Sequence, residues 1–169
     1  GIERSGGKVR LVGLGGTVRN SGDIDVTADA TGASGGQILV STDSVIQQFG
    51  AIRAGSKSGT GGTVVLDSTS GTTMLEAGSS IDAGSESGVG GTVHLLGQQV
   101  GATGNASVSV SGGAGGGTVL FGGDVRGQGE VANARATFLG ADVEITADAL
   151  VQGDGGKIVV FAEEISRIY

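Results

Sequence analysis

The residues of this sequence that could carry out chemistry are few and do not form a recognisable set. Residues 32–36, Gly-Ala-Ser-Gly-Gly, match the G-x-S-x-G pattern of a serine nucleophile. That nucleophile needs a strand–turn–helix setting together with a histidine and an acid. The sequence holds a single histidine, His94, and no helical pattern follows Ser34. We therefore interpret the match as the chance product of a chain rich in glycine and serine, and His94 as an outward-facing strand residue.

Two small groups of acidic residues are the other candidates for chemistry. Asp23, Asp25 and Asp29 form one group, and Glu163–Glu164 form the second. The Gly-Gly-x-Gly-x-Asp pattern of calcium-binding repeats does not occur, and the chain has no cysteine. Solvated surface charge is favoured over a calcium site, so no metal and no cofactor are predicted. Residues 105–107, Asn-Ala-Ser, match the glycosylation acceptor pattern, but most such triplets are unmodified.

Composition excludes several classes of partner. Glycine accounts for 37 of the 169 residues, proline and cysteine are absent, and the net charge is −7. The ten lysines and arginines are scattered, which argues against nucleic acid and against an anionic membrane surface. Apolar runs of four or five residues are too short for a membrane helix or a membrane-barrel strand. With 37% hydrophobic residues, the chain is also unlike a disordered linker, so the glycines must serve a regular structure.

That regular structure is a repeat. One unit, Gly-Gly, polar, apolar, any, apolar, occurs six times at spacings of 29, 26, 29, 26 and 39 residues. The six copies are GGKVRL at 6, GGQILV at 35, GGTVVL at 61, GGTVHL at 90, GGTVLF at 116 and GGKIVV at 155. The third unit contains three short alternating runs, Thr63–Asp67, Thr72–Glu76 and Ser80–Ala83, separated by turn residues. The sequence therefore predicts an all-β parallel β-helix with about 26–29 residues and three short strands per coil.

Stacked coils would place equivalent residues in columns. The first apolar column after each Gly-Gly is Val9, Ile38, Val64, Val93, Val119 and Ile158, and the second is Leu11, Val40, Leu66, Leu95, Phe121 and Val160. We expect both to form the core, with the glycine pairs at corners because glycine adopts positive φ without strain. On the third strand, Asp25, Arg53 and Asp82 are predicted to lie one above another, so that their charges alternate in sign.

The outward position between the two core columns is also mostly aliphatic. Its column runs Arg10, Leu39, Val65, His94, Leu120 and Val159. We call Leu39, Val65, Leu120 and Val159 the outward aliphatic row. It is a candidate binding face, although aliphatic residues also simply fit a pleated strand. The long last interval predicts an extra loop or hairpin at residues 122–136, which we call the insertion.

The last third of the chain resembles a recurring segment of large bacterial exoproteins of the filamentous haemagglutinin type. The matching stretches are GGTVLFGGDVRGQGEVANARATFLGADVEITADAL and GDGGKIVVFAEEISRIY, and GGTVRNSGDIDVTA near the start is similar in style. The resemblance implies a right-handed parallel β-helix and export by two-partner secretion through an outer-membrane transporter. It also implies display at the bacterial cell surface and a part in adhesion, aggregation or biofilm formation. It implies no catalytic residue in this region.

The sequence therefore predicts one β-helix segment over residues 1–169, with about five to six coils. It is expected to be cut from a longer secreted protein whose flanking coils cover its ends. The predicted function is that of a rigid structural and adhesive stalk without enzyme activity. Two alternatives stay open. One is a face that binds host-cell or biofilm glycans or surface proteins, and the other is a polysaccharide-degrading enzyme, for which no converging carboxylates are present.

Overall fold

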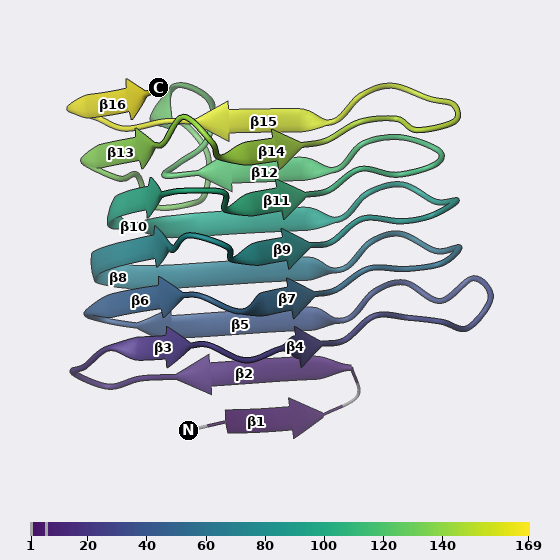
Figure 1. Ribbon diagram of the computed structural model, residues 1–169, viewed down its shortest axis with the longest axis horizontal. Coiled ribbons are helices and arrows are strands. Elements are labelled where there is room, and N and C mark those ends of the chain that lie inside the picture. Colours follow the sequence, from purple (N-terminus) through teal and green to yellow (C-terminus); the bar gives the residue numbers. More distant parts are fainter. Residues whose placement is uncertain (1, 6) are drawn as a thin grey trace.

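The computed structural model describes residues 2–5 and 7–169, and the side chains of residues 7–169. Its backbone forms a parallel β-solenoid of about six turns, in which each coil lies on the preceding one (Figure 1). The predicted fold class is thereby confirmed. Among the described residues, the only helical element is one 3-10 turn, η1 (Val125–Gly127), and no helix is long and apolar enough to cross a membrane.

Each coil runs across three faces. The first face consists of β2 (Lys8–Val12), β5 (Gln37–Thr42), the first halves of β8 (Thr63–Leu75) and β10 (Thr92–Ala102), β12 (Thr118–Phe121) and β15 (Lys157–Val160). The second consists of β3 (Val18–Asn20), β6 (Val45–Gln48), the second halves of β8 and β10, β13 (Ala136–Leu139) and β16 (Ile165–Ile168). The third consists of β4 (Ile24–Asp25), β7 (Ala51–Arg53), β9 (Ser80–Asp82), β11 (Ser107–Ser109) and β14 (Glu144–Thr146). β1 (Ile2–Ser5) pairs with β2 in the antiparallel sense.

Two coils have fewer separate strands than the three that the sequence predicts. In the coils of β8 and β10, the first two runs form one continuous bent strand, which β10 accommodates with an irregularity between Gly97 and Gln99. The hydrogen-bonded ladder continues around this corner because both halves pair with the coils above and below. The coil of β5, β6 and β7 keeps three separate strands.

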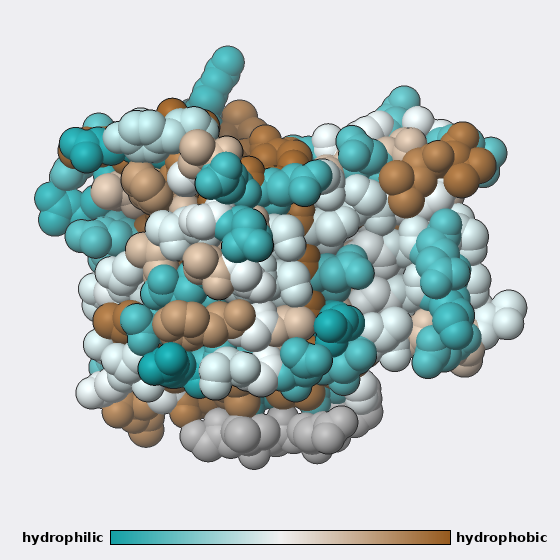
Figure 2. Space-filling view, viewed as in Figure 1, coloured by the Kyte–Doolittle hydropathy of each residue, from teal (hydrophilic) through white to brown (hydrophobic). Residues whose placement is uncertain are grey.

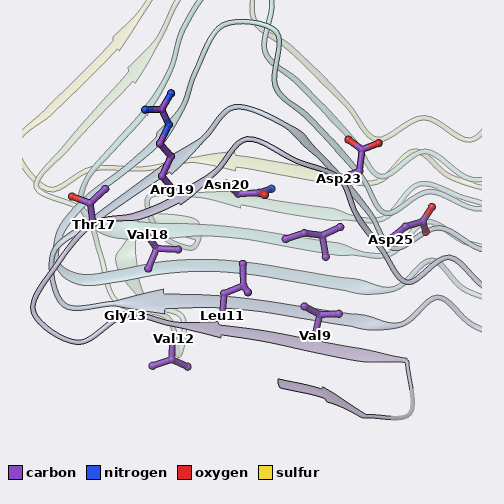
Figure 3. Close-up of a pocket in the computed structure, with 11 residues that line it drawn as sticks. Val9, Leu11, Val12, Gly13, Thr17, Val18, Arg19, Asn20, Asp23 and Asp25 are labelled. Atoms are coloured by element: carbon purple, nitrogen blue, oxygen red, sulfur yellow. The ribbon is translucent and has the colours of Figure 1, made fainter. Parts of the chain in front are cut away.

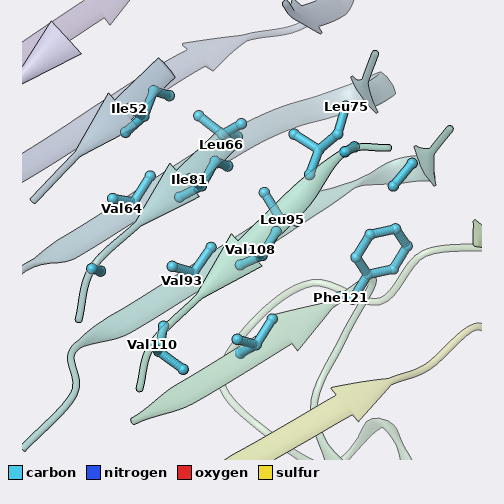
Figure 4. Packing of buried hydrophobic residues seen from close by; sticks show 14 of the residues in the cluster. Ile52, Val64, Leu66, Leu75, Ile81, Val93, Leu95, Val108, Val110 and Phe121 are labelled. Carbon is cyan, nitrogen blue, oxygen red and sulfur yellow. The ribbon is translucent and has the colours of Figure 1, made fainter. Parts of the chain in front are cut away.

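The predicted columns form one side of the core, and inward residues of the second and third faces, such as Leu75 and Ile81, form the rest (Figure 4). In the middle coils, Val64, Leu66, Val93, Leu95 and Phe121 have no exposed surface. Burying a side chain of this size stabilises a fold by about 1.5–3 kcal/mol. Repetition of the columns in every coil produces one continuous aliphatic interior. The columns are less buried at the ends of the rod, where Leu11 and Val160 are partly buried and Ile158 is 43% exposed.

The glycine pairs lie at the predicted corners, but among their described members only Gly7 has the expected positive φ. None of the pairs that begin at residues 35, 61, 90, 116 and 155 has a glycine in the left-handed region. A Cβ on Gly90 would lie 1.7 Å from the carbonyl oxygen of Val110 in the next coil, and one on Gly91 would lie 2.1 Å from that of Gly62 in the preceding coil. The pairs are therefore needed because adjacent coils approach too closely for any side chain.

The third face extends beyond its short strands. Asp25, Arg53 and Asp82 stack in the predicted register. Single parallel bridges then link Ala28, Ser56, Ser85, Gly112 and Ala149 from coil to coil. The hydroxyl groups of Ser56 and Ser85 donate hydrogen bonds of 2.6 and 2.7 Å to the carbonyl oxygens of Ala33 and Gly59. This additional ladder, which the sequence pattern did not reveal, fixes the loops at the side of the rod.

Candidate functional site

The residues singled out for chemistry do not converge. Ser34 is exposed, and the segment that follows it is strand β5 instead of a helix. His94 is half-buried on the outward side of β10. Within residues 2–5 and 7–169, no group of three histidine or acidic side chains is placed to hold a metal ion.

The acidic groups are paired with basic side chains of other coils. Arg53 lies 3.2 Å from Asp23, Lys57 lies 2.9 Å from Asp29, and Arg135 lies 2.8 Å from Glu164. The pKa of the Asp25 carboxyl is lowered, mainly by the hydrogen bond from the Thr27 backbone N–H and to a smaller extent by Arg53. These exposed contacts serve charge balance between coils and contribute little to stability individually.

A cavity of about 750 Å³ lies at the N-terminal end of the rod (Figure 3). Val9, Leu11 and Val18 point into it, while Arg19 and Asp23 lie at its rim. Its walls are the inward residues of the first coil, which are the same columns that form the core further along. The cavity is therefore the N-terminal end of the core, lined by the aliphatic residues of the first coil.

The outward aliphatic row is divided into an open and a covered part. Leu39 and Val65 are partly exposed and line a shallow depression of about 440 Å³, together with Lys8, Arg10 and Thr63. The register aligns Leu39 with Val65 and Val65 with His94, as the repeat predicts. This part of the row is accessible to a partner.

Leu120, by contrast, is only 4% exposed, so its expected accessibility is wrong. The chain between β12 and β13, which contains the insertion, folds back across the outward side of the first face. Asp124 of the insertion lies 2.6 Å from Lys157 on β15, and its charge also acts on His94, the neighbour of Leu120 in the register. Covered in this way, Leu120 is a packing residue. Val159, beside it on β15, is partly exposed.

The insertion is held by several contacts. The Ala134 N–H donates a 2.6 Å hydrogen bond to the Gly122 carbonyl, which closes the loop at its base. Asn133 Nδ2 donates a 3.1 Å hydrogen bond to the Gly127 carbonyl. The Phe161 ring lies against Gly123 and Gly127, where a Cβ would come within 2.9 Å of it. Both glycines have positive φ, so these positions require glycine for conformation and for space.

We expect acid to loosen the insertion. The Lys157 ammonium and then the Val125 N–H lower the pKa of Asp124. The stabilisation that ionised Asp124 gives the closed insertion is therefore present above the ordinary carboxyl pKa and is lost as pH falls through the lowered value. Burial lowers the pKa of His94, although Asp124 opposes the shift, so protonation of His94 begins to disfavour the closed loop below its ordinary value of 6.5. Hydrogen exchange of the Ala134 amide, corrected for intrinsic pH effects, should accelerate as the pH falls from 7 to below the ordinary carboxyl pKa of 3.8, first through His94 and then through Asp124.

Two variants test the cause of that acceleration. Lys157→Met keeps the side-chain stem but removes the charge, so it should accelerate exchange of the Ala134 amide already at neutral pH. Lys8→Met changes the residue of the same column at the other end of the rod and should leave that amide unaffected. Equal effects of the two variants would contradict the assigned contact.

A second surface feature runs along the third face, and we call it the polar groove. It has a volume of about 710 Å³. Three columns of residues line it. The first wall is the column Asp25, Arg53, Asp82 and Ser109, and the second wall contains Asp29, Lys57 and Glu86. The floor between them is Thr27, Gly55, Gly84 and Ser111. Hydrophilic side chains lie on both sides of a pale strip over the right half of the rod in Figure 2. The groove arises because two floor positions have no side chain.

Comparisons with known proteins support the fold. No known protein family and no curated protein matches the sequence. Among solved structures, the chain is similar to the crystal structure of the HMW1 secretion domain from Haemophilus influenzae, with a TM-score of 0.65 and 22% sequence identity. The similarity covers 90% of this chain and 49% of the HMW1 chain, so this chain spans about half the length of the HMW1 chain. At this identity the comparison shows a shared β-solenoid fold.

Proposed function

We propose that this chain is a structural and adhesive segment of a large secreted bacterial surface protein, in which it acts as a rigid β-helical stalk without catalytic activity. The observation that carries the proposal is the continuous parallel ladder along the rod, on which the core columns repeat in every coil. Strands hydrogen-bonded to neighbours on both sides resist bending and proteolysis. Adhesion, aggregation and biofilm formation are the processes in which such a stalk serves.

Export and partners follow from the same proposal. The similar solved structure is described as a secretion domain, which supports secretion of this chain by the two-partner route with an outer-membrane transporter as partner. Further coils of the same polypeptide would cover the exposed apolar residues at the C-terminal end, among them Ile158 and Ile168. Host-cell or biofilm glycans and surface proteins are the proposed extracellular partners.

A display experiment tests the adhesive role. The chain is anchored on a non-aggregating bacterium through an unrelated outer-membrane anchor, and sedimentation and biofilm mass are measured. We expect both to rise relative to the anchor alone. No increase, at equal surface amounts confirmed with an antibody, would refute an adhesive role for this segment.

The open part of the outward aliphatic row is a candidate for the adhesive contact, because Leu39 and Val65 are accessible beside a shallow depression. Leu39→Ser and Val65→Ser should abolish aggregation if this face carries it, with the coil still folded by circular dichroism. Leu120→Ser is unsuitable for this test, since Leu120 is buried and its loss would disturb packing. Retained aggregation in both surface variants would exclude the row.

A further inference from the structure

The walls of the polar groove change charge from coil to coil. In the first coil both walls are acidic, with Asp25 and Asp29, and in the second both are basic, with Arg53 and Lys57. The third coil is acidic again and the fourth presents hydroxyl groups. Alternation within one column relieves repulsion between stacked charges. Its occurrence in two columns, with a nearly empty floor between them, creates a recess lined by both donors and acceptors.

We propose that the polar groove binds a neutral, hydroxyl-rich glycan chain that lies along the axis of the rod. This inference rests on the proposed adhesive function and names its ligand class. A sugar hydroxyl group both donates and accepts hydrogen bonds. Arg53 and Lys57 offer N–H donors in the middle of the groove, and Asp82 and Glu86 offer acceptors in the next coil.

Charge selects against ionic polymers. Four carboxylates and two cations line the groove, and both cations are paired, Lys57 with Asp29 at 2.9 Å and Arg53 with Asp23 at 3.2 Å. An anionic polysaccharide would meet repulsion in two of the coils. A cationic one would have to pass the Arg53 and Lys57 pair between them. A neutral chain avoids both costs and uses the donors that the ion pairs leave free.

The dimensions suit a short stretch of glycan. The polar part of the groove spans four coils, and Leu150 of the fifth coil lies at its end. Adjacent strands are about 4.8 Å apart, so the polar part is about 14 Å long. This accommodates a short oligosaccharide in extended form. The volume of about 710 Å³ lies within the range of about 300–1,000 Å³ that is usual for ligand sites. At Gly55 and Gly84 a ring can approach the backbone directly.

Gly55 provides a specific way to block the groove. A Cβ there would lie 3.4 Å from the Gly84 carbonyl oxygen and 3.8 Å from the Thr27 methyl group, and Gly55 does not have a positive φ. Gly55→Leu should therefore fold and fill the floor. Gly84 cannot be used, because a Cβ there would come within 2.7 Å of the Ser111 carbonyl oxygen. Gln47→Leu on the outward side of β6 is the matched control.

The test is calorimetric titration of the chain with neutral hexasaccharides of glucose and of galactose in α and β linkages. Hexagalacturonate is the anionic arm and a chitosan hexamer the cationic arm. We expect binding of at least one neutral chain, little affected by salt, and a loss of at least about ten-fold in affinity for Gly55→Leu but not for Gln47→Leu. Lys57→Met and Glu86→Gln, which alter exposed wall residues only, should weaken binding as well.

The contrary outcomes are distinct. Failure of every neutral chain to bind, equal affinity in wild type and Gly55→Leu, or binding only of a charged oligomer that salt abolishes would each overturn the inference. Absence of oligosaccharide binding together with aggregation by displayed wild type would contradict the groove while leaving the proposed function intact. Oligosaccharide binding without any aggregation by displayed wild type would contradict the function and support the groove.

Discussion

Replacing Gly90 by alanine is expected to lower the free energy of unfolding by about 3 kcal/mol or more. The added Cβ would lie 1.7 Å from the Val110 carbonyl oxygen, and this oxygen belongs to the backbone of the next coil. It accepts the 2.8 Å hydrogen bond from the Gly117 N–H that closes the following corner, so it cannot move alone. Denaturant unfolding followed by circular dichroism measures the loss.

The repeat itself provides the control for this substitution. Gly155 occupies the equivalent position in the last pair, where no further coil is stacked in the described part of the chain. Its Cβ would meet only the Ala147 carbonyl oxygen at 3.8 Å, an ordinary contact. Gly155→Ala should therefore change stability by less than about 0.5 kcal/mol. Similar losses at Gly90 and Gly155 would show that close approach between coils is not the reason for the glycine pairs.

Leu66→Ala is expected to cost about 2–5 kcal/mol of unfolding free energy. Leu66 has no exposed surface and lies between Val40 and Leu95 in the second core column. Truncation leaves a cavity. The hydrogen-bonded strands on either side cannot move together to fill it. Urea denaturation should show a lower midpoint, and small-angle scattering of the folded protein should be unchanged.

An exposed leucine supplies the comparison. Leu14 is 93% exposed, so Leu14→Ala removes no buried surface and should alter stability by less than about 0.5 kcal/mol. If Leu66→Ala were equally mild, the interior of the rod would have to be loosely packed. That result would also remove the physical basis of the proposed stiffness.

The coil architecture could be predicted because the determining signals are local and repeated. Two-residue alternation after each Gly-Gly identifies the first strand of a coil. The spacing of the repeats also fixes which residues stack, as Asp25, Arg53 and Asp82 demonstrate. The ion pair itself was not predictable. Arg53 contacts Asp23 at 3.2 Å, while the stacked Asp25 accepts a 2.8 Å hydrogen bond from the Thr27 N–H.

Composition and period alone therefore determined the fold class, the core columns and the position of the corners, since each coil repeats the same short-range pattern. Only the tertiary structure decided which outward residues are accessible and what the glycines do. The insertion covers Leu120 through contacts to strands about thirty residues away in sequence, as with Asp124 and Lys157. The polar groove likewise joins residues of five coils. Exposure depends on how separate coils are juxtaposed, and no local pattern records that arrangement.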